Sequence, residues 1–230
     1  GSGNTFLGGS AGRYVTSGSV NTFVGQFAGY CVGSGTENTA VGCAAGSRAT
    51  SGSHNTSIGR AAGWGNCTGA GNVAVGHSAG FGVKGSNNIS IGATTGPAGT
   101  DAIDGSGNDN ILIGRQVGTS LTTGSCNIFM GVCAGVNAGT ASSSILIGSC
   151  AGKCMVSNCQ LSQGNIYIGE NAGKCSTTGY VNVLIGKDAG CSLKESVTTI
   201  AIGAHAGSKT CAANDNVFIG TRAGTCNTTG

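Results

Sequence analysis

Short apolar runs recur along the chain at a nearly constant interval, and each run ends in a glycine. Examples are "NTFVG" (21–25), "NTAVG" (38–42) and "NTSIG" (55–59). Thirteen such runs occur, and nine of the twelve intervals between their closing glycines are 17 residues, the others being 16, 22 and 21. A fixed period of about 20 residues predicts stacked repeats that each form one structural unit. We call the closing glycine of each run the key glycine.

The columns of this repeat predict its local structure. An aliphatic residue or Met precedes every key glycine, a second glycine always follows four residues later, and Ala precedes the second glycine in eleven of the thirteen units. The β-branched runs predict short strands, and the paired glycines allow turns where a Cβ atom would clash. Because 17 residues are too few for a helical hairpin, the repeat fits one coil of a β-solenoid.

We therefore expect an all-β fold, a single β-solenoid (β-roll or β-helix) of about thirteen coils of 17 residues. At about 4.8 Å per coil, the stack would be roughly 60 Å long. Residues 1–230 are expected to form one continuous repeat domain with insertions near 97–109 and 153–164. Neither end carries a capping unit, so we expect a segment of a longer fibre or repeat array.

Asparagine stands four residues before the key glycine in eleven units. Stacked asparagines can hydrogen-bond from coil to coil and satisfy buried backbone groups, so this column predicts a ladder. Ser144 and Thr199 replace asparagine in two units. The predicted ladder residues are Asn21, Asn38, Asn55, Asn72, Asn88, Asn110, Asn127, Asn165, Asn182 and Asn216.

Both faces of each predicted strand are mostly apolar. Residues one and three before the key glycine, such as Ile168 and Ile166, should share one face, and the residue between them, here Tyr167, should point the opposite way. Strands that are apolar on both faces are usually covered on both. Either another chain or a second layer of the same coil would cover the second face.

Three phrases of the repeat carry a resemblance to known proteins: "NTAVGCAAG" (38–46), "NVAVGHSAG" (72–80) and "TIAIGAHAG" (199–207). They resemble the head repeats of trimeric autotransporter adhesins, and they are still more similar to Asn-Thr-rich repeats of phage tail-fibre and related surface proteins. The adhesin resemblance implies a left-handed parallel β-roll, the association of three chains, and a surface that binds host ligands.

Composition and charge exclude several classes of protein. The 46 glycines lack the spacing of collagen and only one proline is present, while 39% hydrophobic residues and a net charge of +3 argue against disorder. There is no basic cluster for nucleic acid and no apolar run of transmembrane length, so we expect neither nucleic acid nor membrane as a partner, and no cofactor. Twelve cysteines without a CxxC pair favour an oxidising setting, extracellular or on a virion surface.

The cysteines predict disulfides between neighbouring coils, since stacked Cα atoms lie within the disulfide range. Metal binding or a catalytic thiol is the alternative, but the three histidines lie in separate coils. The predicted pairs are Cys133 with Cys150, Cys175 with Cys191, Cys211 with Cys226, and Cys154 with Cys159. Cys31, Cys43, Cys67 and Cys126 have no assigned partner.

The few acidic residues give little sign of catalysis, and we do not expect an enzyme. The strongest acidic column, Glu170 and Asp188, adjoins Lys187 and predicts a surface ion pair. Asp101, Asp104 and Asp109 are a weak candidate for a calcium site, for which a solvated insertion loop is the alternative.

Several surface residues are candidates for modification or contact. Among the four Asn-x-Ser/Thr sequons, Asn66 and Asn227 lie outside the ladder and are the expected glycosylation sites in a eukaryotic secretory product. The aromatic contact candidates are Tyr14, Tyr30, Trp64 and Phe81. A threonine column that could bind ice ends after four coils, so we rank ice binding low.

These patterns favour a structural subunit or segment of an extracellular or viral fibre. It would be a rigid rod stapled by disulfides, with other copies of itself as partners, either head to tail in a filament or side by side in an oligomer such as a trimer. The alternative is an adhesin or receptor-binding tail-fibre module that recognises glycans or a host surface through its variable loops.

Overall fold

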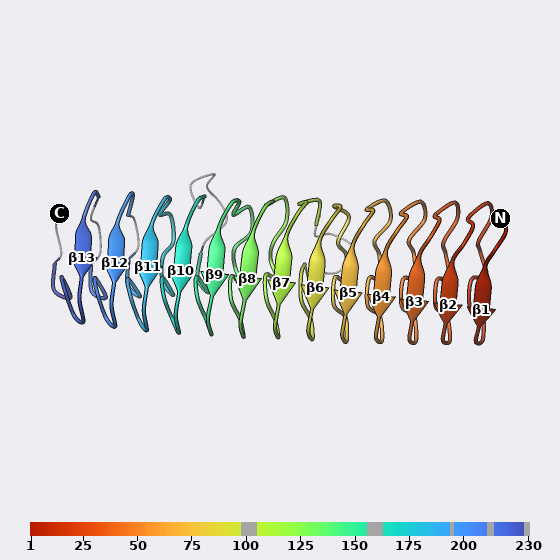
Figure 1. The fold of residues 1–230 in the computed structure, drawn as a ribbon, viewed down its shortest axis with the longest axis horizontal. Helices are drawn as coiled ribbons and strands as arrows, with labels where there is room; N and C mark the ends of the chain where they lie inside the picture. The colour runs from red at the N-terminus through yellow and green to blue at the C-terminus, as the bar shows by residue number, and fades with distance from the viewer. Residues whose placement is uncertain (98–104, 156–162, 194–195, 211–213, 228–230) are drawn as a thin grey trace. The chain divides into compact units, whose positions relative to one another are not determined.

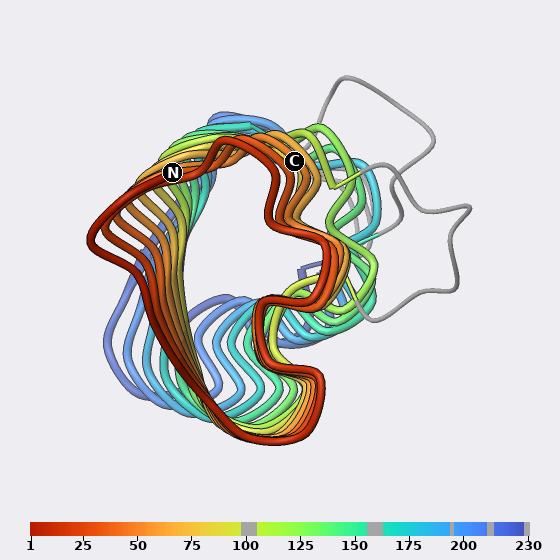
Figure 2. The same ribbon diagram turned by 90° about the vertical axis from the view of Figure 1, so that its right-hand side faces the viewer.

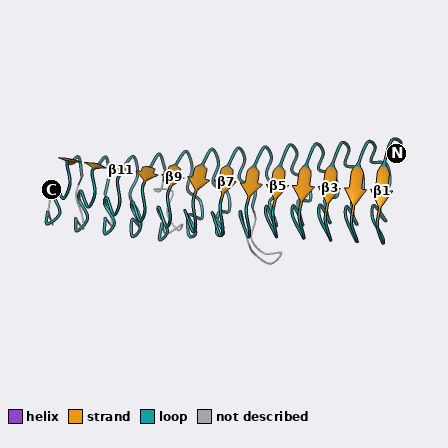
Figure 3. Ribbon diagram, turned by 60° about the horizontal axis from the view of Figure 1, so that its bottom comes forward, coloured by secondary structure: helices purple, strands orange, loops and turns teal. Residues whose placement is uncertain are grey.

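The computed structural model describes residues 1–97, 105–155, 163–193, 196–210 and 214–227. These residues contain thirteen strands of three residues each and no helix, which confirms the all-β prediction. Figure 1 shows one strand in each coil, and the rest of the coil consists of loops and turns (Figure 3). The strands are β1 (Thr5–Leu7), β2 (Thr22–Val24), β3 (Thr39–Val41), β4 (Thr56–Ile58), β5 (Val73–Val75), β6 (Ile89–Ile91), β7 (Ile111–Ile113), β8 (Ile128–Met130), β9 (Ile145–Ile147), β10 (Ile166–Ile168), β11 (Val183–Ile185), β12 (Ile200–Ile202) and β13 (Val217–Ile219).

The chain divides into two compact units, unit 1 (Gly1–Ile113) with β1 to β7 and unit 2 (Gly114–Gly230) with β8 to β13. Within each unit every strand pairs in parallel with the next strand of the chain, with corresponding residues opposite each other, as for Ile166 and Val183. Seen along the stack, the first coils of unit 1 superpose closely (Figure 2). The fold is therefore a β-solenoid. We name each coil by its strand.

Steric contacts explain the two glycine columns. The key glycine Gly25 has φ +134°, and a Cβ atom there would lie 2.6 Å from the carbonyl oxygen of Gly42 in the next coil. The second glycine of the same coil, Gly29, has φ +57°, and a Cβ atom there would collide with the ring of Phe23. Both positions need glycine because the backbone or the core occupies the space of a side chain.

A column of left-handed residues was not predicted. The residue two positions after the key glycine has a positive φ in every coil, although few of these residues are of a type, such as Asn or Asp, that readily adopts this conformation. Examples are Ala44 at 56°, Cys133 at 57° and His205 at 58°. Its backbone N–H bonds to the previous coil, as from Ala44 to Gln26 O at 2.8 Å. That repeated hydrogen bond offsets the backbone strain of the left-handed conformation.

The middle residue of most strands faces the interior. In strands β2 to β12 it is buried, while its two neighbours are half-buried or exposed, which confirms the predicted alternation. Phe129 and Leu184, for example, are completely buried. On the opposite face Val41 is 37% and Ile58 is 41% exposed. Within each unit the described strands belong to one sheet, so no second layer of described strands covers this face.

Candidate functional site

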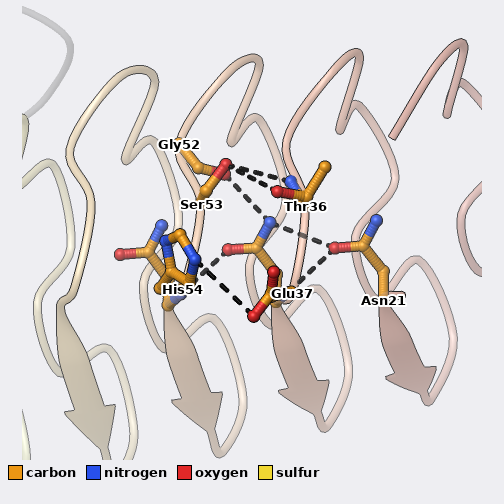
Figure 4. Close-up of polar contacts among 8 residues, drawn as sticks. Asn21, Thr36, Glu37, Gly52, Ser53 and His54 are labelled. Atoms are coloured by element: carbon orange, nitrogen blue, oxygen red, sulfur yellow. Dashed lines mark hydrogen bonds and ion pairs between the residues drawn. The ribbon is translucent and has the colours of Figure 1, made fainter. Parts of the chain in front are cut away.

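The asparagine column forms the predicted ladder. Asn21 Oδ1 accepts the backbone N–H of Asn38 at 2.9 Å and its side-chain amide at 3.1 Å, and Asn38 Nδ2 also donates to Gly52 O at 2.9 Å (Figure 4). The two replacements keep the ladder in place, because the N–H groups of Ser144 and Thr199 donate to the asparagine of the preceding coil at 3.0 and 2.8 Å.

One predicted ladder residue differs from the rest. Asn216 is half-buried, and its amide donates to Asn214 O at 2.9 Å in its own coil. The other nine predicted members are at most 6% exposed. Because neutral amides that already hydrogen-bond have no group free for acid–base chemistry, we assign the ladder a structural role.

Ionisable side chains lie close together across neighbouring coils on the surface. Lys187 Nζ lies 3.2 Å from Glu170 Oε2, which confirms the predicted ion pair. His54 Nε2 lies 3.6 Å from Glu37 Oε2 (Figure 4), and His205 Nδ1 lies 3.8 Å from Asp188 Oδ2. Exposed pairs of this kind are each worth less than about 1 kcal/mol.

The ten described cysteines are free thiols. Cys133 and Cys150 occupy corresponding positions in adjacent coils, as predicted, with the N–H of Cys150 bonded to Val132 O at 2.8 Å. Cys159 and Cys211, members of two predicted pairs, lie outside the described residues. The stacked arrangement that a cross-coil disulfide needs is therefore present at Cys133 and Cys150, without the bond.

The pairing predicted for Cys175 and Cys191 stays a prediction: both are free thiols, and the N–H of Cys175 donates to Cys191 O at 2.9 Å. Cys175 is six residues after its key glycine and Cys191 is five, so Cys191 does not stand in the corresponding position. The cysteine that corresponds to Cys175 in the neighbouring coil is Cys154, since each stands six residues after its key glycine. Burial is the main cause that raises the pKa of Cys154 above its usual value, and the contact with Cys175 adds to it.

The aromatic candidates gather into two groups in unit 1. The ring centroids of Tyr14 and Tyr30 are 5.0 Å apart in an edge-to-face arrangement, and the side-chain interaction with Tyr14 is the main cause that raises the pKa of Tyr30. Phe27, which is 40% exposed and was not predicted, contacts Tyr30 at 5.4 Å. Trp64 and Phe81 stack at 4.5 Å.

Cations accompany both aromatic groups. The guanidinium carbon of Arg48 lies 4.6 Å from the ring centroid of Trp64, and that of Arg13 lies 5.5 Å from the ring centroid of Tyr14. Phe81 and Arg48 are near enough to Trp64 to interact with its ring face. The ring of Trp64 thus contacts Arg48 and Phe81, whereas the side chain of Tyr14 is 50% exposed to solvent.

The two expected glycosylation sites differ in access. Asn66, for which we expected an accessible side chain, is only 4% exposed; its amide nitrogen donates to Asn55 Oδ1 at 3.3 Å, and its oxygen accepts the N–H of Gly69 at 3.0 Å. The part of the coil that follows the second glycine turns inward here and hydrogen-bonds to the ladder, so the folded chain does not expose Asn66. Asn227 is half-buried.

The weak calcium candidate is only partly described. Asp101 and Asp104 lie outside the described residues, and Asp109 accepts a hydrogen bond from Asn87 Nδ2 at 3.1 Å. In the part of the chain that the structure describes, no group of three or more His, Cys, Asp or Glu side chains is placed to hold a metal ion. That part also has no helix able to cross a membrane.

Three hydroxyl groups in the interior are unusual. Tyr167 is completely buried, its hydroxyl lies 2.8 Å from Ser176 Oγ, and burial raises its pKa to about 12. In unit 1 the hydroxyls of Ser90 and Thr95 are buried with no hydrogen-bond partner. Small strand-centre residues such as Ser57 and Ala74 line small spaces beside Ser90.

Comparisons of the chain with protein-family models, with curated proteins and with solved structures found no match. The resemblance to adhesin head repeats and tail-fibre repeats therefore stays a prediction.

Proposed function

We propose that the chain is a structural segment of an extracellular or viral fibre and that it associates with other copies of itself. The observation that carries this proposal is the outward face of the strands. In all thirteen strands the two outward residues are Thr, Val, Ile, Leu or Met, so the face of each unit carries no charge along its strands. Parallel sheets are usually covered on both faces.

Another copy of the chain is a suitable cover for this face. Its exposed side chains include Leu7 (66%), Ile91 (38%) and Ile219 (68%), and apolar surface of this kind is typical of interaction sites. A second copy repeats its outward side chains at the same coil spacing of about 4.8 Å, so two faces can interdigitate coil by coil. Since the face is uncharged, like copies do not repel each other there.

The test is the assembly state of the purified chain, measured by light scattering and electron microscopy with and without reductant. We expect oligomers or filaments, and we expect Ile58→Lys together with Ile91→Lys to dissociate them while circular dichroism stays unchanged. Thr68→Lys adds a charge at an exposed loop position and is the matched control. A wild-type chain that stays monomeric up to millimolar concentration would contradict the proposal.

The second candidate function, glycan or host-surface adhesion, is favoured by the aromatic group at Tyr14. This ring is half exposed beside Arg13 and contacts Tyr30, which in turn contacts Phe27, so an aromatic face and a cation are available to a sugar or an acidic group. Tyr14→Ser with Phe27→Ser should abolish attachment to glycan arrays or cells and leave assembly unchanged. Trp64→Ser is the comparison, because the ring of Trp64 already contacts Arg48 and Phe81.

A further inference from the structure

Cys154 and Cys175 meet across two neighbouring coils of unit 2. Each stands six residues after its key glycine, Gly148 in the coil of β9 and Gly169 in the coil of β10. The N–H of Cys154 donates to the carbonyl of Lys174, the residue before Cys175, at 2.9 Å. This bond aligns the two cysteines as direct neighbours between parallel segments, about 4.8 Å apart, which lies inside the Cα range of disulfides.

The side chains complete the geometry. Burial raises the pKa of Cys154, and the thiol of Cys175 lies near enough to raise it further. Both residues are partly exposed, which gives a small oxidant access.

Other cysteine pairs lack this combination. Cys133 and Cys150 correspond in position, but Cys133 Sγ donates to Gln116 Oε1 at 3.7 Å and Cys150 Sγ accepts from Ser149 Oγ at 3.9 Å. Cys191 stands one residue out of step with Cys175, and its sulfur donates to Ser208 O at 3.4 Å. At Cys154 and Cys175 the backbone is aligned, and the thiol of Cys175 lies near enough to Cys154 to raise its pKa.

We propose that Cys154 and Cys175 are a disulfide site that covalently joins the coils of β9 and β10. The oxidant is a low-molecular-weight disulfide such as oxidised glutathione. A cysteine thiolate attacks it, forming a mixed disulfide and releasing one thiolate; the second cysteine thiolate then displaces the remaining thiolate. In total two protein thiols become one disulfide, two glutathione thiols form, and the protons of the cysteines pass to them.

The benefit of this disulfide rests on the proposed structural role, since a bond between coils would keep the stacked coils from separating. Formation of the disulfide itself does not require the chain to assemble. Burial raises the pKa of Cys154, which leaves less of its thiolate at neutral pH. Oxidation of the pair should therefore be faster at pH 9 than at pH 7.

The test uses the full chain, reduced and then incubated with oxidised glutathione, with samples alkylated by iodoacetamide at intervals and digested for mass spectrometry. The expected result is a peptide pair joined through Cys154 and Cys175 that accumulates before other links. Cys175→Ser should abolish this peptide pair, whereas Cys133→Ser, a partly exposed cysteine outside the pair, should leave it unchanged. Circular dichroism confirms that each variant folds.

Two results would overturn the inference: a bond from Cys154 to Cys159 or from Cys175 to Cys191 in its place, or alkylation of both Cys154 and Cys175 after other cysteines have been oxidised. The same samples examined by electron microscopy separate the two proposals. Fibres without the Cys154–Cys175 bond would refute only the disulfide, and the bond without fibres would refute only the assembly.

Discussion

Asn38 donates two hydrogen bonds to the side-chain oxygen of Asn21, one from its backbone N–H at 2.9 Å and one from its side-chain amide at 3.1 Å. A single oxygen thus satisfies two donors of the next coil, and the arrangement repeats with Asn88 and Asn110, where the two distances are both 3.0 Å. These groups are buried, where water cannot replace a lost partner, so each coil depends on the next for its polar groups.

Asn38→Ala should therefore lower the free energy of unfolding by about 3 kcal/mol, because it leaves buried groups of Asn21, Gly52 and Asn55 with fewer partners. Chemical denaturation monitored by circular dichroism measures the change. Asn216→Ala is the control: Asn216 is half-buried and bonds within its own coil, so its loss should cost less than about 1 kcal/mol. Equal losses for the two variants would show that the ladder is not a major source of stability.

Two second glycines with the same backbone conformation should respond differently to alanine. Gly29 and Gly46 both have φ +57°, but a Cβ atom at Gly29 would collide with the ring of Phe23, whereas at Gly46 it would lie 3.1 Å from the Cβ atom of Ala40. Gly46→Ala carries the left-handed strain of about 1 kcal/mol and a tight contact. Gly29→Ala adds overpacking of about 1–3 kcal/mol.

Thermal unfolding of Gly29→Ala and Gly46→Ala compares the two costs directly. Similar melting temperatures would mean that backbone strain, rather than the ring of Phe23, makes glycine necessary in this column. The pair separates the two causes because the backbone conformation is the same in both.

Features that repeat in every unit could be predicted from the sequence, and features set by tertiary contacts could not. The strands, the glycine turns and the ladder each depend on a residue type, so the columns reveal them. The left-handed column two residues after the key glycine contains Ala44, Cys133 and His205 among others. Closure of the coil, not the side chain, determines this conformation, and so the sequence gives no sign of it.

The burial of Asn66 illustrates the same limit. Asn66 follows the second glycine of its coil, where the sequence differs from coil to coil, and only the fold shows that its amide donates to Asn55. The alignment of Cys154 with Cys175 was available from the sequence, since each stands six residues after its key glycine. The 21-residue interval between these glycines suggested instead that Cys154 closes its own loop with Cys159. Counting from the key glycine finds the cysteine that occupies the same position in the neighbouring coil.

Tyr167 should make the stability of the chain depend on alkaline pH. Its pKa is about 12 in the folded chain and about 10 when unfolded, so the unfolded state loses the phenolic proton first. Above pH 10 the folded state holds more protons, and the free energy of unfolding falls by roughly 1.4 kcal/mol per pH unit until about pH 12. Below pH 10 this contribution is constant.

Denaturation at pH 8 to 11.5 tests this dependence by comparing wild type with Tyr167→Phe. Every other ionisable group is the same in both proteins, so the difference between the two isolates Tyr167. We expect Tyr167→Phe to be less stable at pH 8, because Ser176 loses a buried partner, and to lose stability less steeply above pH 10. Parallel curves would mean that Tyr167 ionises in the folded chain as readily as in the unfolded one.

Two buried hydroxyls should lower stability rather than raise it. Ser90 Oγ and Thr95 Oγ1 have no hydrogen-bond partner, and leaving such a group buried costs about 1–3 kcal/mol. Ser90→Ala and Thr95→Val remove the hydroxyls and leave nearly the same shape, so each should raise the free energy of unfolding by about 1 kcal/mol. Ser144→Ala is the matched control, because Ser144 Oγ donates to Ser142 O at 3.1 Å and accepts the N–H of Asn165 at 3.3 Å. Its loss should destabilise the chain by about 1–2 kcal/mol, and if Ser90→Ala is destabilising to the same extent, the hydroxyl of Ser90 has a partner in solution.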